Sequence, residues 1–444
     1  MGNNLRLLYS SNAIWSQSGY GVQGRSLLPR LAALPEFGGI QNIAMFAWYG
    51  MQGGMMDLSG LRCYPAGVDP YGNDIIESHA KDFKANIVIS LIDVWVMKET
   101  AKKVAPSLWL PWTPIDHDPV PQAVINALQG AHLTLSYSKW GRDMLNRVGI
   151  KNEYIPHGVE TNIYCLHEPE NVARFRREVF GISNDTHLTV MVAANKGYPD
   201  RKAFQVQMRA WANFAKDKPN AKLYLHTEST PMYGGLDLPA LIANLGIHQR
   251  VLFPDRYQYF KGLPPEYMAL MYNAADVYLG NSMAEGFGIP LIEAQACGTP
   301  VIVTDFSSMP ELVRWGYKIA PADMFWTPMN AWQAWPDMRG ITDALNELYE
   351  QWDANGRQWP VAQRQKAQEA IHGEYSWDAI VRDNWMPLVA RLADEAPQLT
   401  PSVNAPLPQK GEVKRIERSV TGGLRRVDPV GVSVNGHETE LVAG

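Results

Sequence analysis

One stretch of the 444-residue chain constrains its fold more than any other: residues 281–311, NSMAEGFGIPLIEAQACGTPVIVTDFSSMPE. An apolar run ending at Leu279 stops at a loop rich in glycine, and a helical segment follows at 291–297. A strand that turns through such a loop into a helix presents the first backbone N–H groups of that helix to an anion. The stretch therefore predicts a Rossmann-like unit with a seat for a diphosphate.

Two carboxylates add to this prediction. Glu285 lies before the helix, and Glu293 lies eight positions later, too far inside the helix to cap it. A buried carboxylate at that position needs hydrogen-bond donors, and the hydroxyls of a sugar or a ribose supply them. The alternative is an ordinary strand, turn and helix that carries two incidental surface glutamates.

The run EGFGIPLIEAQACGTPVIVTD, residues 285–305, resembles the signature of family 4 retaining glycosyltransferases of GT-B architecture. The resemblance implies an α/β fold of two Rossmann-like, doubly wound domains that face a cleft. It also implies that Glu285 contacts the donor sugar, that the backbone after it contacts sugar and phosphate, and that Glu293 holds the ribose hydroxyls. The donor-binding positions in this motif are Gly286, Phe287, Gly288, Ile289 and Glu293.

Composition fits two globular domains. The chain is 46% hydrophobic and 19% charged, and its formal charge of −5 gives no general preference for polyanions such as nucleic acid. Cys63, Cys165 and Cys297 are far apart and lack the spacing of metal ligands, so we expect reduced thiols and a cytoplasmic protein. We expect no secretion signal and no membrane span, because no stretch is long and apolar enough.

The N-terminal half begins as a second Rossmann-like unit. A strand is predicted at 5–9, and Gly19 and Gly21 precede an amphipathic helix, although the full dinucleotide fingerprint is missing. The resemblance places Gly19, Tyr20 and Gly21 at the cleft. The alternative is a tight turn that needs the freedom of glycine.

Polar residues follow the next predicted strands of this half. Asp93 comes after a strand at 86–91, and the run from Asp116 to Asp118 comes after a strand at 108–112, so these side chains are candidates for the cleft. In the family, His117 corresponds to a residue that bonds the acceptor or the donor sugar. Two alternatives remain: Asp116 and Asp118 chelate a divalent cation, or they cap a helix at 122–128. We predict no metal site and no required cofactor.

Basic residues follow the first predicted strand of the second half, residues 187–193. Asn195, Lys196, Arg201 and Lys202 lie in or near the following loop, where cations neutralise the charge that develops on a departing diphosphate. The family uses an arginine or asparagine and a lysine here. Asn195 and Lys202 match best, Arg201 or Lys196 is a substitute, and a solvated basic face is the alternative.

The predicted domains are an N-terminal acceptor-side domain at 1–159 and a nucleotide-sugar-binding domain at 160–374. A helix at 375–393 is expected to cross back to the first domain. From 394 to 444, prolines, small polar residues and a basic segment predict an extended or disordered tail.

The resulting hypothesis is a hexosyltransferase-type enzyme that moves a sugar from a nucleotide-diphosphate sugar to an acceptor with retention, using His117, Glu285 and Lys202 in catalysis. The donor is UDP-, GDP- or ADP-linked, and the acceptor is a glycan, lipid, protein or modified nucleobase. Three alternatives stay open: a phosphorylase or epimerase of the same fold, a catalytically silent carbohydrate-binding protein, and a DNA-modifying transferase that uses the basic tail.

Overall fold

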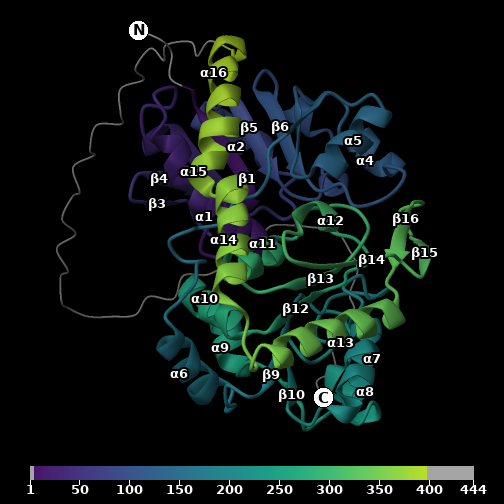
Figure 1. Cartoon of the computed structure of the whole chain (residues 1–444). Coiled ribbons are helices and arrows are strands. Elements are labelled where there is room, and N and C mark those ends of the chain that lie inside the picture. The colour runs from purple at the N-terminus through teal and green to yellow at the C-terminus, as the bar shows by residue number, and fades with distance from the viewer. Residues whose placement is uncertain (1–4, 398–444) are drawn as a thin grey trace, which may run out of the picture. The chain divides into compact units, whose positions relative to one another are not determined.

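The computed structural model describes residues 5–397 and contains two open sheets with helices packed against them (Figure 1). The central strands of both sheets are short and almost wholly buried, as expected when helices cover both faces of a parallel sheet. The two sheets agree with the predicted α/β fold of two Rossmann-like units.

The first sheet is formed entirely by the N-terminal part of the chain. Its eight strands lie in the order β3-β4-β2-β1-β5-β6-β7-β8, with the bounds Met56–Leu58, Leu61–Tyr64, Ile43–Tyr49, Leu7–Asn12, Ile87–Leu91, Leu108–Thr113, Thr134–Ser136 and Asn152–Tyr154. Every neighbouring pair is parallel except β3 and β4. The accompanying helices are α1 (Gly19–Ala32), α2 (Ile76–Phe83), α3 (Thr100–Val104), α4 (Gln122–Ala127) and α5 (Lys139–Arg147).

The second sheet is wholly parallel. Its strands lie in the order β11-β10-β9-β12-β13-β14, with the bounds Val251–Leu252, Ala221–His226, His187–Val192, Val277–Gly280, Val301–Thr304 and Gly316–Ile319. Its helices are α6 (Pro169–Val179), α7 (Phe204–Phe214), α8 (Leu238–Asn244), α9 (Arg256–Lys261), α10 (Pro265–Ala274), α11 (Ile289–Ala296), α12 (Met309–Leu312) and α13 (Met338–Ala354).

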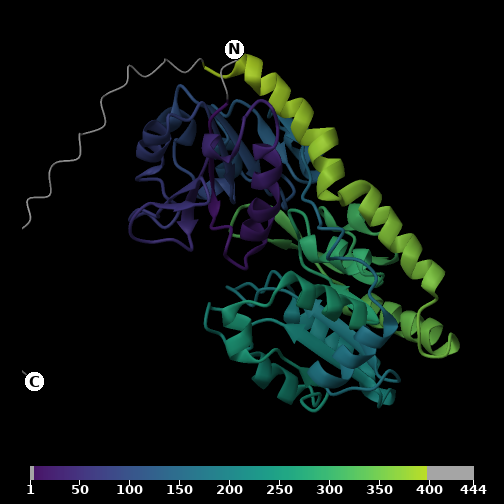
Figure 2. The ribbon, with the colours of Figure 1, turned by 90° about the vertical axis from the view of Figure 1, so that its left-hand side faces the viewer.

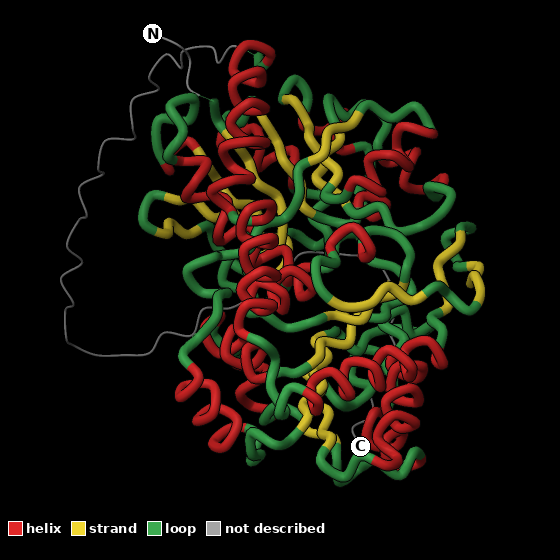
Figure 3. The backbone as a smooth tube through the Cα atoms, in the orientation of Figure 1, coloured by secondary structure: helices red, strands yellow, loops and turns green. Residues whose placement is uncertain are grey.

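A separate two-stranded hairpin joins β14 to α13. Its antiparallel strands are β15 (Asp323–Trp326) and β16 (Trp332–Trp335), and it stands apart from both sheets at the right of Figure 3. The sequence patterns indicated neither this hairpin nor the hairpin of β3 and β4, because both consist of very short strands in segments rich in turn residues.

The last described segment is almost continuously helical. It comprises α14 (Val361–Tyr375), α15 (Trp377–Ile380), a π-helical turn at Val381–Trp385 and α16 (Met386–Glu395). Figure 2 shows this run alongside both sheets. Arg391 pairs with Glu153 and the Glu395 carboxylate lies 2.7 Å from His132, so α16 lies beside the first sheet.

The chain passes between the sheets at two points that are bonded to each other. The N–H of Val159 donates to the carbonyl of Tyr375 at 2.8 Å, and the N–H of Trp377 donates to the carbonyl of Val159 at 3.3 Å. Gly158 allows this approach, because a Cβ at that position would lie 2.5 Å from the Trp377 ring. The predicted domain limits, 159 among them, stay predictions, and the predicted tail from 398 onward lies outside the described residues.

Candidate active site between the two sheets

The loop between β12 and α11 approaches the first sheet directly. Gly286 lies against Pro114, and any Cβ at this position would collide with that proline. Gly288, at the start of α11, has a φ of +111°, which side-chain-bearing residues rarely adopt. The two glycines therefore allow the backbone of the predicted diphosphate loop to lie where the two sheets meet.

Glu285 is the centre of a network of charged and hydroxyl groups. Its Oε1 lies 2.5 Å from Lys202 Nζ and 2.6 Å from the Ser282 hydroxyl, and its Oε2 lies 3.5 Å from Arg201 Nη1. Burial raises the pKa of Glu285, but the charges of Lys202 and Arg201 outweigh burial, and the pKa is lowered. The carboxylate is therefore an anion held between two cations.

Arg201 and Lys202 lie in the loop between β9 and α7. Arg201 Nη1 donates to the carbonyl of Ala284 at 2.6 Å and lies 4.0 Å from Asp116 Oδ2, so it links the second sheet to the first. Burial lowers the pKa of Lys202, although the neighbouring Glu285 opposes the shift. Both residues thus meet the predicted motif in space, although about 80 residues separate them from it in sequence.

Asn195, predicted as a donor ligand, is bound to protein backbone. Its side-chain amide donates to the carbonyl of Leu236 at 2.7 Å and accepts the N–H of the same residue at 2.8 Å. Lys196 points elsewhere, with its Nζ 5.3 Å from the ring centre of Tyr233. Of the four polar or basic residues of this segment, Arg201 and Lys202 are the two that contact Glu285.

The first sheet contributes residues from the ends of β5 and β6. Asp116 Oδ1 lies 2.7 Å from His117 Nδ1. Burial raises the pKa of Asp116, but His117, Arg201 and Lys202 outweigh it, and the pKa is lowered. Asp116 and Asp118 do not cap α4, which has no side-chain cap and begins after Pro121.

A second cluster of polar groups adjoins these residues. The Tyr20 hydroxyl lies 3.4 Å from Asp93 Oδ2 and 3.4 Å from the hydroxyl of Tyr137. Partial desolvation between the two sheets and the charge of Asp116 raise the pKa of Asp93, and the solvent that still reaches this residue attenuates the shift. Gly19 and Gly21 lie at the start of α1, and a Cβ at Gly19 would touch Ile289 at 3.4 Å.

Glu293 lies one turn inside α11 and is 9% exposed. Its Oε2 accepts a hydrogen bond of 2.9 Å from the Tyr272 hydroxyl. Burial raises the pKa of Glu293 to about 7, and the bond to Tyr272 only partly offsets this effect. The carboxyl group therefore titrates near neutral pH, unlike Glu285.

Several residues of this site belong to no motif recognised in the sequence. The Ser307 hydroxyl accepts the N–H of Glu285 at 3.0 Å, and the Ser308 hydroxyl lies 2.8 and 2.6 Å from the carbonyls of Glu285 and Phe287. These serines follow β13, the strand beside β12, so the rule that ligands gather at the carboxyl ends of parallel strands is the one signal that points to them.

Among residues 5–397, no three His, Cys, Asp or Glu side chains are grouped so that they could hold a metal ion. Between the same limits, no helix combines the length and the apolarity that crossing a bilayer demands. The described Cys63, Cys165 and Cys297 are free thiols.

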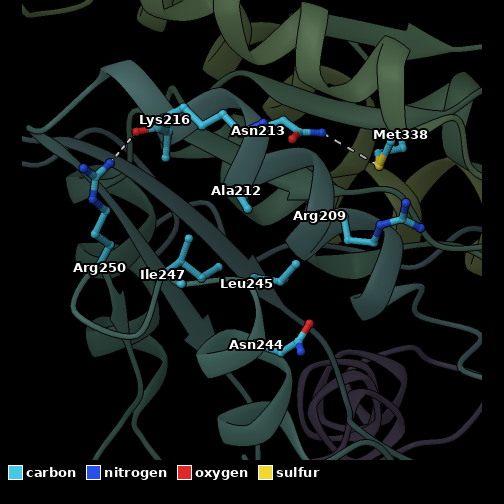
Figure 4. A pocket seen from close by; sticks show the side chains of 11 residues that line it. Arg209, Ala212, Asn213, Lys216, Asn244, Leu245, Ile247, Arg250 and Met338 are labelled. Carbon is cyan, nitrogen blue, oxygen red and sulfur yellow. Dashed lines mark hydrogen bonds between the residues drawn. The ribbon is translucent and has the colours of Figure 1, made fainter.

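A large pocket lies away from these residues, on the side of α7 and α8. Arg209, Lys216 and Arg250 contribute to its lining, but Figure 4 shows Arg209 pointing away from the other two. Arg250 donates to the carbonyl of Lys218 at 3.1 Å. The cations of this pocket do not converge, so it lacks the geometry of an anion site.

Residues 177–359 match the model of a protein family described as glycosyl transferases group 1. The chain contains a group 1 glycosyltransferase domain. Lys202, Glu285 and Glu293 lie within the matched residues, whereas Tyr20, Asp93 and His117 lie outside them.

Comparison with curated proteins gives partial relatives of this glycosyltransferase domain. A D-inositol 3-phosphate glycosyltransferase from Nocardia farcinica is 38% identical over 120 residues, which are 26% of this chain and 25% of the relative. The chain therefore matches about a quarter of the length of that relative.

Solved structures resemble the chain over a much larger share. Sucrose-phosphate synthase from Thermosynechococcus elongatus has a TM-score of 0.66 at 18% identity, covering 88% of this chain and 99% of that one. HepE from Anabaena, solved with UDP and glucose, has a TM-score of 0.61 at 15% identity, covering 87% and 100%. At these identities the likeness shows that the group 1 glycosyltransferase domain is part of a GT-B fold.

Proposed function

We propose that this protein transfers a sugar from a nucleotide-diphosphate sugar to an acceptor, with retention at the anomeric carbon. The observation that carries the proposal is the cluster of Arg201, Lys202 and Glu285 opposite Asp116 and His117, at the facing carboxyl ends of the two sheets. In open α/β sheets, ligands bind at this end of the strands.

The two cations supply the electrostatic part of the reaction. As the bond between sugar and diphosphate breaks, negative charge develops on the departing phosphate, and fixed cations stabilise that charge. Arg201 and Lys202 are held by Glu285, Ala284 and Asp116, so they are oriented before a donor arrives. This preorganisation lowers the barrier without a further rearrangement of the cations.

The remaining roles follow from the positions of the side chains. We assign the donor sugar to Glu285 and the loop from Gly286 to Ile289, and the ribose to Glu293. His117, fixed by its bond to Asp116, is assigned to the acceptor side. Closure of the site would exclude water and so limit hydrolysis of the donor.

The donor and acceptor are proposed as classes. The structure of HepE with UDP and glucose favours a UDP-linked donor for the first trials, and GDP and ADP stay in the comparison. The name of the Nocardia relative makes an inositol phosphate one acceptor to test, beside glycans, lipids, proteins and modified nucleobases.

A thermal-shift panel of UDP, GDP, ADP and their sugar conjugates, with and without Mg²⁺, tests this proposal. A ligand that binds only the native state raises its apparent stability, so one nucleotide should give a selective shift. We expect the shift without Mg²⁺, and a strictly Mg²⁺-dependent shift would contradict transfer without a resident metal. If no nucleotide shifts the protein, the transferase proposal is wrong.

Retention needs a separate measurement. Once a donor and an acceptor are found, the anomeric configuration of the first-formed product is read from its proton NMR spectrum. The same configuration as in the donor supports retention, and the opposite configuration refutes it.

A further inference from the structure

The hairpin of β15 and β16 carries aromatic side chains that the donor site does not use. Its register places Trp326 opposite Trp332, and their ring centroids are 4.7 Å apart. The two residues are 49% and 41% exposed. Large aromatic residues gathered at the surface of a short hairpin are typical of a binding surface.

A hollow of about 410 Å³ lies between this hairpin and the loop that precedes Arg201. This volume lies within the range of sites for small molecules. Its aromatic lining comes from Tyr198 on one side and from Phe325, Trp326 and Trp335 on the other, and Tyr198 is 83% exposed. The hollow therefore places four aromatic side chains around one ligand.

The polar groups of the hollow are almost all neutral. Gln205 and Asn330 offer side-chain amides, and the described lining includes one carboxylate, Asp200, and neither lysine nor arginine. Asp200 is 7% exposed and accepts the N–H of Gln205 at 3.2 Å, so it is engaged with backbone. Phosphorylated ligands and nucleic acids need cations along their path, which this lining lacks.

The aromatic side of the hollow is held rigidly. Phe325 and Trp335 pack against the apolar core of the second sheet, and Met329 in the turn packs against that of the first. The backbone of Trp332 exchanges two hydrogen bonds with Asp118, of 2.8 and 3.1 Å. Because these aromatic residues are already ordered, a ligand that binds them does not have to offset the free-energy cost of ordering them.

The hollow adjoins the proposed reaction centre through both of its walls. The Tyr198 to Asp200 segment runs directly into Arg201 and Lys202, which contact Glu285. On the hairpin side, Asp118 follows His117 in the chain. A molecule bound in the hollow would thus extend from the site of transfer.

We propose that this hollow binds a neutral sugar unit of an oligosaccharide acceptor, beside the unit that receives the transferred sugar. The C–H face of a sugar ring carries partial positive charge and stacks on the negative face of an indole or phenol ring, while its hydroxyls bond the amides of Gln205 and Asn330. This inference rests on the proposed transferase function and narrows its acceptor from five classes to one, the glycans.

The test is calorimetric titration of the full-length protein with maltopentaose, cellopentaose and chitopentaose. We expect at least one pentasaccharide to bind, and Trp326→Ala and Tyr198→Ala each to weaken that binding at least fivefold. Trp95→Ala is the matched control, because Trp95 is also 49% exposed but lies outside the hollow. It should change the affinity less than twofold.

The thermal shift with UDP, GDP or ADP is measured on the same variants, to separate this inference from the proposed function. A nucleotide shift without binding of any of the three pentasaccharides would overturn the sugar subsite and leave the donor site standing. Equal pentasaccharide affinities of wild type, Trp326→Ala and Tyr198→Ala would also overturn it. Pentasaccharide binding that depends on Trp326, with no nucleotide shift, would uphold the subsite and refute the transferase.

Discussion

Lys202 and Glu285 form an ion pair across two loops of the second sheet, with 2.5 Å between Nζ and Oε1. Their side chains are 21% and 16% exposed, so water screens the pair only in part. The pair fixes the position of the lysine and lowers the pKa of the glutamate against the effect of burial. It is the contact on which the proposed donor site depends most.

Lys202→Ala should therefore lower the rate of sugar transfer about 100-fold, the usual effect of removing one preorganised group that stabilises developing charge. Release of nucleoside diphosphate from the sugar donor measures the rate. Lys196→Ala is the control, since Lys196 lies in the same loop but faces Tyr233, and it should stay within about threefold of wild type. Equal losses in the two variants would show a general effect of charge.

Glu293→Ala and His117→Ala should separate donor binding from transfer. The ribose contact assigned to Glu293 predicts a weaker nucleotide thermal shift for Glu293→Ala. His117→Ala should keep the full shift and lose transfer about 100-fold, because His117 belongs to the opposite sheet. The two assignments fail together if both variants bind nucleotide and transfer sugar as wild type does.

The raised pKa of Glu293 also leads to a prediction of how the stability of the protein depends on pH. Its folded pKa of about 7 lies above the value of about 4.3 expected in the unfolded chain. As pH rises from about 4.5 to 7, the unfolded state loses this proton and the native state keeps it, so stability falls across this window and the loss is complete above it. Glu293→Gln removes the titration and should gain up to about 3 kcal/mol over wild type at pH 8.

Urea unfolding at pH 4.5 and pH 8 measures this difference. At the lower pH both proteins carry a neutral group at this position, and their stabilities should agree within about 1 kcal/mol. A constant gap between the two proteins at both pH values would contradict the raised pKa of Glu293.

Substitution of Glu311, which lies at a contact between the two sheets, should lower the stability of the protein. Its carboxylate accepts the N–H groups of Lys139 and Trp140 at 2.9 and 3.0 Å, and so caps α5 from α12. Hydrogen bonds to charged groups contribute about 1.5–3 kcal/mol, so Glu311→Ala should lower the free energy of unfolding by about 2 kcal/mol. Urea unfolding at neutral pH measures this.

Asp353→Ala is the control for Glu311→Ala. Asp353 pairs with Arg357 on the surface of α13, and both side chains are nearly half exposed. Such pairs contribute about 0.5 kcal/mol. If the two variants lose the same stability, the cap at α5 is not a significant contact.

Much of this architecture could be predicted from residue patterns. The strand predicted at 108–112 is found one residue longer, and the strand predicted at 86–91 begins one residue later. The apolar run before Asn281 and the glycine loop after it gave β12 and α11, because continuous apolar strands and helix starts have strong local signals.

The site could be predicted only in part. Lys202 and Glu285 were both candidates, but their pairing depends on the order of β9 and β12 in the sheet, which sequence patterns do not specify. Ser307 and Ser308 could not be predicted for the same reason, because they reach the site only through the pairing of β13 with β12. The tryptophans of β15 and β16 gave no readable pattern, because each strand has four residues and alternation needs a longer run.

The hydrogen bonds of Val159 to Tyr375 and Trp377 join the two connections between the sheets into one hinge. We expect the two connections to move together, so that an opening of the site is a rotation about this hinge and not a sliding of one sheet past the other. Phe287, whose ring centre is 5.8 Å from that of Tyr375, lies close to this hinge and would move least. The diphosphate loop would then keep its place, while contacts between the sheets that lie farther from the hinge would break.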